Sequence, residues 1–78
     1  MSKIEFADKI ANGRDIMFVI GEQGFTILTW HAEGICISKW DDDFHFYYET
    51  PEELIENYIY EGLPLEESLD RIVITNYA

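Results

Sequence analysis

Four apolar runs with only short polar turns between them constrain the fold of this chain more than any other feature. The runs are residues 16–20, 25–30, 35–40 and 44–49, and the turns are residues 21–24, 31–34 and 41–43. Glycines beside polar residues, or consecutive aspartates, are typical of turns between strands. Connections this short join antiparallel neighbours, because parallel strands need a long crossover. The pattern predicts a four-stranded antiparallel β-meander.

Helices are predicted before and after the meander in the sequence. Ser2 and Glu5 have capping-box spacing, so residues 2–11 fit a helix that ends at Asn12-Gly13 in a left-handed C-cap. Asn-Gly is also a strong hairpin signal, and a strand is the alternative for this segment. Asp8 breaks the alternation that a strand would need, so the helix is favoured.

A second helix is indicated by Thr50, Pro51 and Glu53. Thr50 is a good N-cap, Pro51 suits the first helical position, and Glu53 completes a capping box. We expect this helix to end at Gly62. A further short helix is expected around residues 65–71.

Composition favours a single small acidic domain over residues 1–78. The chain is 47% hydrophobic and 15% aromatic, which is too apolar for a disordered acidic tail despite a net charge of −11. For residues 72–77 the sequence allows either a strand or a helix, and their β-branched side chains favour a terminal strand. The predicted class is therefore α+β: the four-stranded meander, an N-terminal helix, two short C-terminal helices and this terminal segment.

No apolar run approaches the ~20 residues of a membrane span and no signal-peptide core is present, so we expect a cytoplasmic protein with no membrane partner.

The two halves of the chain differ in charge. Residues 1–40 hold five acids and four bases, whereas residues 41–78 hold eleven acids and one base, Arg71. One interpretation is a solvated surface that keeps the protein in solution, and the other is a field that attracts a basic protein surface. On the second interpretation the partner-binding residues are Asp41, Asp42, Asp43, Glu49, Glu52, Glu53, Glu56, Glu66 and Glu67.

Alternation along the strands divides the side chains between two faces. One face gathers the expected core, which includes Phe44 and Phe46. The other face is mixed and carries Trp30, Trp40 and Tyr47. Either a helix or the terminal segment covers these rings, or they form a partner-binding surface, since Trp and Tyr dominate binding hot spots. A homodimer is the alternative to a foreign partner at this face.

The sequence shows no pattern typical of a catalytic or metal site. His31, Cys36 and His45 are spaced unlike any usual zinc site, and an EF-hand calcium loop starting at Asp41 would need glycine where Phe46 stands. Cys36 with His45 suggests a thiol nucleophile, but a cysteine between two isoleucines in a strand is typically buried and inert. We expect no metal, no cofactor and no enzymatic activity. The net charge of −11 also disfavours direct nucleic-acid binding.

A series of short motifs runs along most of the chain. They are Asn12-Gly13-Arg14, the strand at residues 15–20, the glycine-containing hairpin, Thr50-Pro51-Glu52-Glu53-Leu54 and Gly62-Leu63-Pro64-Leu65-Glu66-Glu67. Their order resembles small uncharacterised cytosolic domains of Gram-positive bacteria and their phages. The resemblance implies a small α+β domain and brings no catalytic residues.

The expected function is protein binding without enzymatic activity. In its most concrete form, a phage or mobile-element inhibitor occupies the basic surface of a nucleic-acid-handling protein, where its carboxylates imitate DNA. The alternative is an accessory domain that self-associates through the aromatic strand face.

Overall fold

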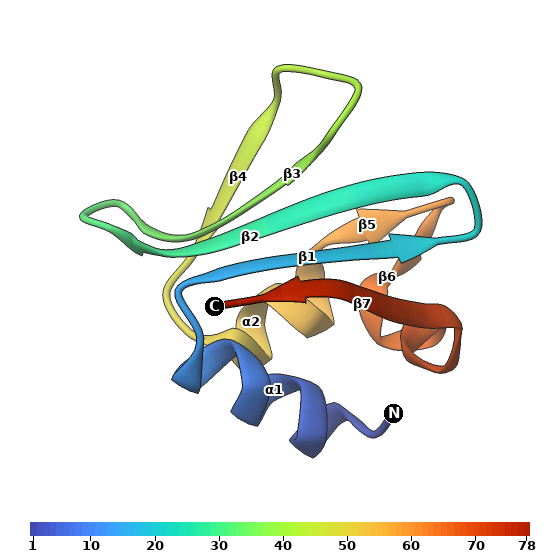
Figure 1. The fold of residues 1–78 in the computed structure, drawn as a ribbon, viewed down its shortest axis with the longest axis horizontal. Coiled ribbons are helices and arrows are strands. Elements are labelled where there is room, and N and C mark those ends of the chain that lie inside the picture. Colours follow the sequence, from blue (N-terminus) through green and yellow to red (C-terminus); the bar gives the residue numbers. More distant parts are fainter.

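A five-stranded antiparallel sheet with helices on one side forms the protein in the computed structural model, which describes residues 1–78 (Figure 1). The strand order is β4-β3-β2-β1-β7. The strands are β1 (Asp15–Ile20), β2 (Gln23–His31), β3 (Gly34–Lys39), β4 (His45–Tyr48) and β7 (Ile72–Tyr77). The predicted α+β class and the meander are confirmed. The terminal segment is a strand, and it pairs with β1 at one edge of the sheet.

The N-terminal helix α1 (Lys3–Asn12) begins as predicted. Ser2 accepts a hydrogen bond from the backbone N–H of Glu5, and the Glu5 carboxylate accepts one from the N–H of Ser2. The predicted left-handed cap is wrong, because Gly13 is extended with φ −104°. Glycine is needed there for space, since a Cβ atom would lie 2.9 Å from the ring of Tyr77.

The second helix, α2 (Pro51–Asn57), starts at the predicted cap but ends well before Gly62. The chain instead turns back as a small hairpin of β5 (Ile59–Tyr60) and β6 (Leu63–Pro64). Glu61 and Gly62 form its turn with φ of 55° and 79°, so Gly62 supplies the left-handed conformation to a hairpin and not to a helix end. The predicted short helix follows as the 3-10 helix η1 (Leu65–Arg71).

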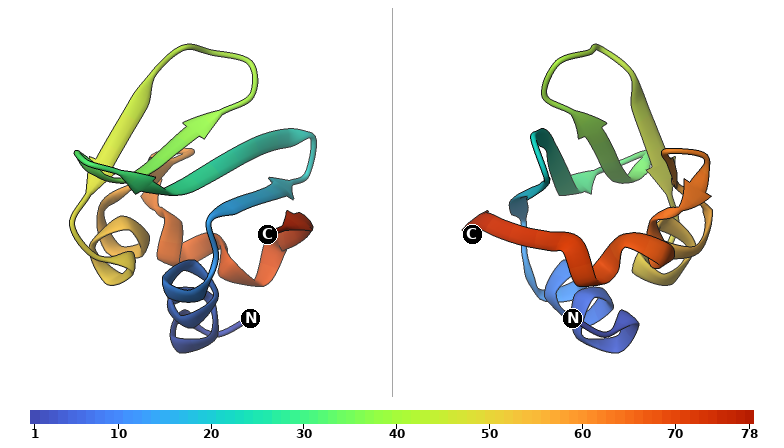
Figure 2. Two further views of the ribbon diagram at one scale, coloured as in Figure 1. Left: turned by 60° about the vertical axis from the view of Figure 1, so that its left-hand side comes forward. Right: turned by 90° about the vertical axis from the view of Figure 1, so that its right-hand side faces the viewer.

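The core lies between the sheet and the three helices. At its centre Phe18 of β1 pairs with Phe25 of β2, and their rings stack with centroids 4.8 Å apart. Phe6 of α1 meets Phe18 edge-on at 5.6 Å, which anchors that helix to the sheet. The views in Figure 2 show α1 and α2 below the sheet from two further directions.

The expectation that Phe44 and Phe46 belong to the core is wrong. Phe44 is 70% exposed in the loop before β4, and Phe46 is 47% exposed on β4 itself. β4 is an edge strand, so its core-facing side chains have neighbours on one side only. Phe46 still meets the ring of Tyr58, with centroids 5.6 Å apart. No helix of the structure has the length and apolar character that crossing a membrane requires.

Candidate functional site

The face of the sheet that points away from the helices carries both tryptophans. We call it the open face. Its side chains are Asp15, Met17, Val19, Thr26, Leu28, Trp30, Cys36, Ser38, Trp40, His45, Tyr47 and Val73, as the alternation with the buried residues and the strand register require. Trp30 and Trp40 are each 53% exposed. Of the two alternatives, the one in which a helix or the terminal segment covers them is therefore wrong, because the helices lie on the opposite side (Figures 1 and 2).

Both indoles are held in place by hydrogen bonds within the sheet. Trp30 Nε1 donates to Asp15 Oδ1 at 2.9 Å, and Trp40 Nε1 donates to Thr26 Oγ1 at 2.9 Å. The ring of His31 stacks on Trp30 with centroids 4.4 Å apart. The exposed rings are thus fixed features of the surface.

Cys36 lies on the same face beneath larger side chains. Its Sγ is 3.6 Å from His45 Nδ1, so the structure does bring together the two residues considered as a thiol nucleophile. Burial raises the pKa of the Cys36 thiol, while a hydrogen bond with Tyr47 opposes that shift. A thiol that stays protonated is a poor nucleophile and a poor metal ligand. No group of three or more His, Cys, Asp or Glu side chains is arranged to hold a metal ion.

The predicted acidic residues do not form one surface. Asp41, Asp42 and Asp43 lie in the loop between β3 and β4, which projects away from α2 and η1 (Figures 1 and 2). The other predicted acids lie on or beside the two helices: Glu49, Glu52, Glu53, Glu56, Glu66 and Glu67. A partner would therefore meet two separate groups of carboxylates.

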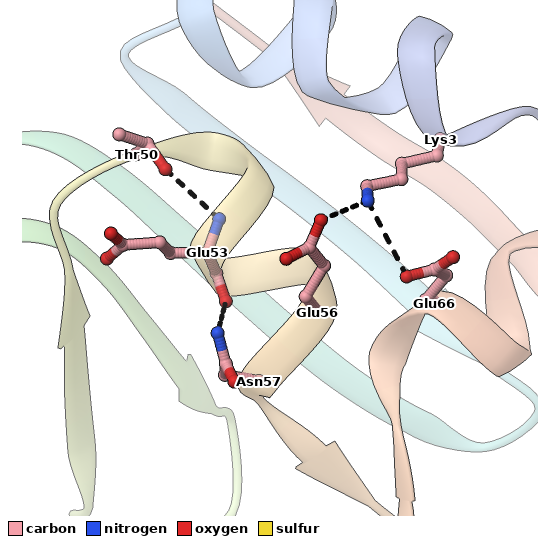
Figure 3. A network of polar contacts seen from close by, with 6 residues as sticks. All are labelled: Lys3, Thr50, Glu53, Glu56, Asn57 and Glu66. Atoms are coloured by element: carbon pink, nitrogen blue, oxygen red, sulfur yellow. Dashed lines mark hydrogen bonds and ion pairs between the residues drawn. The ribbon is translucent and has the colours of Figure 1, made fainter.

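Two of the helix-side acids have a structural role. Lys3 of α1 forms ion pairs with Glu56 of α2 and with Glu66 of η1, the latter at 3.7 Å between Nζ and Oε1 (Figure 3). The hydrogen bond with Glu56 raises the pKa of Lys3. These contacts tie three elements together, and Lys3 offsets part of the negative charge of Glu56 and Glu66.

The lysines and arginines other than Lys3 form no ion pair with the other predicted partner-binding acids. Arg71 binds Glu61 at 3.1 Å, whereas Lys9 lies over Tyr77 and Lys39 over Tyr60. None of the bases forms an ion pair with an aspartate of the β3–β4 loop or with Glu52 and Glu67. These exposed carboxylates keep an uncompensated negative charge.

Several residues that shape the open face were missed by the sequence analysis. Asp15 anchors the Trp30 indole, and Gly24 leaves the space that Trp40 fills; Thr26 was placed on this face by alternation, but its hydrogen bond with Trp40 was not predicted. Strand parity was a usable signal for Asp15, because it alternates with the buried residues of β1. Glu22 and Glu33, in the turns beside the open face, carried no signal beyond their charge.

Comparisons with known protein families, with curated proteins and with solved structures give no match to this chain.

Proposed function

We propose that this chain is a non-enzymatic protein-binding domain that engages a basic surface of another protein. The observation that supports this proposal most is the charge of residues 41–78, which contain eleven acidic residues and one arginine. Arg71 is occupied by Glu61, and Lys3 is the one base from the first half that pairs with these acids. The carboxylates without an ion pair, those of the β3–β4 loop together with Glu52 and Glu67, are therefore available to a cationic partner.

Charge of this kind acts mainly on how fast partners associate and on how they orient. A nucleic-acid-handling protein offers a suitable surface, because its phosphate-binding groove is rich in Lys and Arg. An acidic domain that occupies such a groove competes with the nucleic acid. The concrete form of the proposal is an inhibitor of this type.

The experiment that tests the function is capture of proteins from a Gram-positive bacterial lysate on the immobilised chain. An unrelated acidic domain of equal net charge serves as the matched control. We expect a basic protein that binds this chain and not the control, that is released when salt screens the charges, and that loses its DNA when the chain is added. The same set of proteins on both columns would show mere ion exchange and would overturn the proposal.

Self-association through the open face is the second candidate function. The exposure of Trp30 and Trp40 favours it, since large exposed apolar areas mark interaction sites. The net charge of −11 on each copy opposes it. Light scattering over a range of protein concentrations separates the two candidates, because only self-association raises the mass with concentration.

A further inference from the structure

Building on the proposed function, we propose that the open face is the docking site for an extended, arginine-bearing segment of the basic partner. The guanidinium groups stack on Trp30 and Trp40, and they pair with the carboxylates of the neighbouring turns.

The open face has an uncharged centre. It carries no Lys or Arg, and its one carboxylate, on Asp15, already accepts a hydrogen bond from Trp30. Lys39 of β3 belongs to the opposite side of the sheet, where its Nζ lies over Tyr60 of the small hairpin, 5.8 Å from the ring centroid. A cation that arrives at this face therefore has no resident cation to displace.

The two indoles can stack against a partner, but they have no free N–H group to donate to it. Each Nε1–H is already satisfied inside the sheet, by Asp15 for Trp30 and by Thr26 for Trp40. What remains for a partner is one face of each ring, because Trp30 stacks on His31 with its other face and Trp40 lies over Gly24 with its other face. A free aromatic face attracts cations, and planar guanidinium groups in particular. Because the rings are fixed in advance, binding costs little side-chain entropy.

An acidic turn lies beside each tryptophan. Trp30 is followed by the β2–β3 turn with Glu33, whose Oε1 lies 3.9 Å from His31 Nδ1, and Trp40 is followed directly by Asp41. Gln23 Nε2 donates to Asp41 Oδ1 at 3.0 Å, which ties the β3–β4 loop to the end of β2 next to Glu22. A guanidinium on either indole thus finds a carboxylate at the rim, and arginine can stack and pair with its planar fork at the same time.

The same rim disfavours a second copy of the chain at this face. Two copies placed face to face would bring their acidic turns together, and like charges across an interface are unfavourable. Charge complementarity therefore selects a cationic occupant over self-association.

The positions of the rings also set a spacing. Trp40 lies over Gly24 and hydrogen-bonds Thr26 near the start of β2, whereas Trp30 belongs to its far end. At ~3.3 Å per residue these points are roughly 13–20 Å apart along the strand. An extended segment covers that span in about four to six residues, and the even spacings of four and six keep both arginines on the same side.

The test uses two synthetic peptides of equal charge that carry either arginine or lysine about four residues apart among serine and threonine. Binding is followed through tryptophan fluorescence, to which only Trp30 and Trp40 contribute. We expect the arginine peptide to bind more tightly than the lysine peptide, because only the planar guanidinium stacks on an indole and pairs with a carboxylate at the same time. Loss of both cation–π contacts in a variant without the indoles should weaken its binding about five- to thirtyfold. The double variant Trp30→Leu/Trp40→Leu, titrated by calorimetry, should lose this preference. Ile4→Ser, on an exposed position of α1, is the control that should keep it.

Each other outcome has a distinct meaning. Equal binding of both peptides, unchanged in the double variant, would overturn this inference and leave the proposed function standing. No binding of either peptide would overturn both. A dimer that the double variant abolishes would assign the open face to a second copy and overturn the arginine proposal.

Discussion

The indole ring of Trp40 occupies the space that a side chain at Gly24 would need. Gly24 pairs with Val19 of β1, so it lies within the sheet and not in the turn that the sequence indicates. The ring reaches across β2 and donates its Nε1–H to Thr26. One exposed aromatic ring of the open face therefore depends on a missing Cβ atom on the adjacent strand.

Gly24→Ala should push the Trp40 ring off the sheet. The new methyl group would overlap the indole, and the hydrogen bond to Thr26 would be lost, at a cost of about 1 kcal/mol in the free energy of unfolding. We expect a red-shifted tryptophan emission and a lower denaturation midpoint. Gly21→Ala is the control: its φ of +60° makes alanine strained, but nothing lies within 4 Å, so stability should fall while the emission stays unchanged. An unshifted emission in Gly24→Ala would contradict the packing described above.

The parts of the fold that the sequence predicts correctly are those that depend on local chemistry. The strands follow from apolar runs and turn residues, and both N-caps follow from a hydroxyl three residues before a glutamate. The predicted end of α2 at Gly62 is wrong because Asn57 ends the helix earlier and the following hairpin uses Gly62. The side chain of Asn57 donates to the carbonyl of Glu53 at 2.9 Å at the end of the helix, and Gly62 is used by the following hairpin.

The candidate site was only partly predictable, because much of it comes from contacts between distant residues. Trp30, Trp40 and Tyr47 were placed on the correct face by alternation alone. That nothing covers this face depends on where the helices pack, which local patterns do not contain. The pairing of Lys3 with Glu56 joins residues far apart in the sequence, so no local pattern indicates this contact.

Thr50→Ala should destabilise the protein by about 1 kcal/mol, the usual loss for an N-cap. Thr50 Oγ1 accepts the backbone N–H of Glu53 at 3.1 Å, and that donor has no replacement in the helix. The carboxylate of Glu53 accepts the N–H of Glu49 at 3.3 Å and not that of Thr50, so the other half of the capping box is displaced by one residue. Urea denaturation measures the change. Thr50→Ser keeps the acceptor and should stay near the original midpoint, and an equal loss in both variants would contradict the capping role.

Stability should fall in alkaline solution through Tyr58. Burial, followed by the charge of Asp42, raises the pKa of Tyr58 to about 12, above its ordinary value of 10.0. Because the folded state holds this proton more tightly than the unfolded state, the contribution is complete below pH 10 and is lost as the pH rises to about 12. The loss over that window is roughly 2–3 kcal/mol.

Denaturation midpoints measured across this alkaline window test the role of Tyr58. Tyr58→Phe should fall less steeply than the unaltered protein, because phenylalanine has no proton to lose. Tyr77→Phe is the control: it removes the hydroxyl that donates to the Lys9 carbonyl at 2.7 Å, so its midpoint should start lower, and it should keep the steep fall. Identical slopes in all three proteins would assign the alkaline loss to other groups.

Lys3→Met should destabilise the protein in dilute buffer, and added salt should reduce the difference. Lys3 joins α1 to Glu56 on α2 and Glu66 on η1, and without it these carboxylates repel one another and Glu52. Lys9→Met removes the same charge from a lysine that lies over the ring of Tyr77, so it should cost less. Salt screens the exposed charges over ~10 Å at 0.1 M and ~3 Å at 1 M, so the two variants should converge as it is added. The unaltered protein should itself become more stable with salt, because its net charge of −11 opposes a compact state. Equal losses in the two variants at low salt would mean that overall charge, and not the contact between the three elements, accounts for the contribution of Lys3.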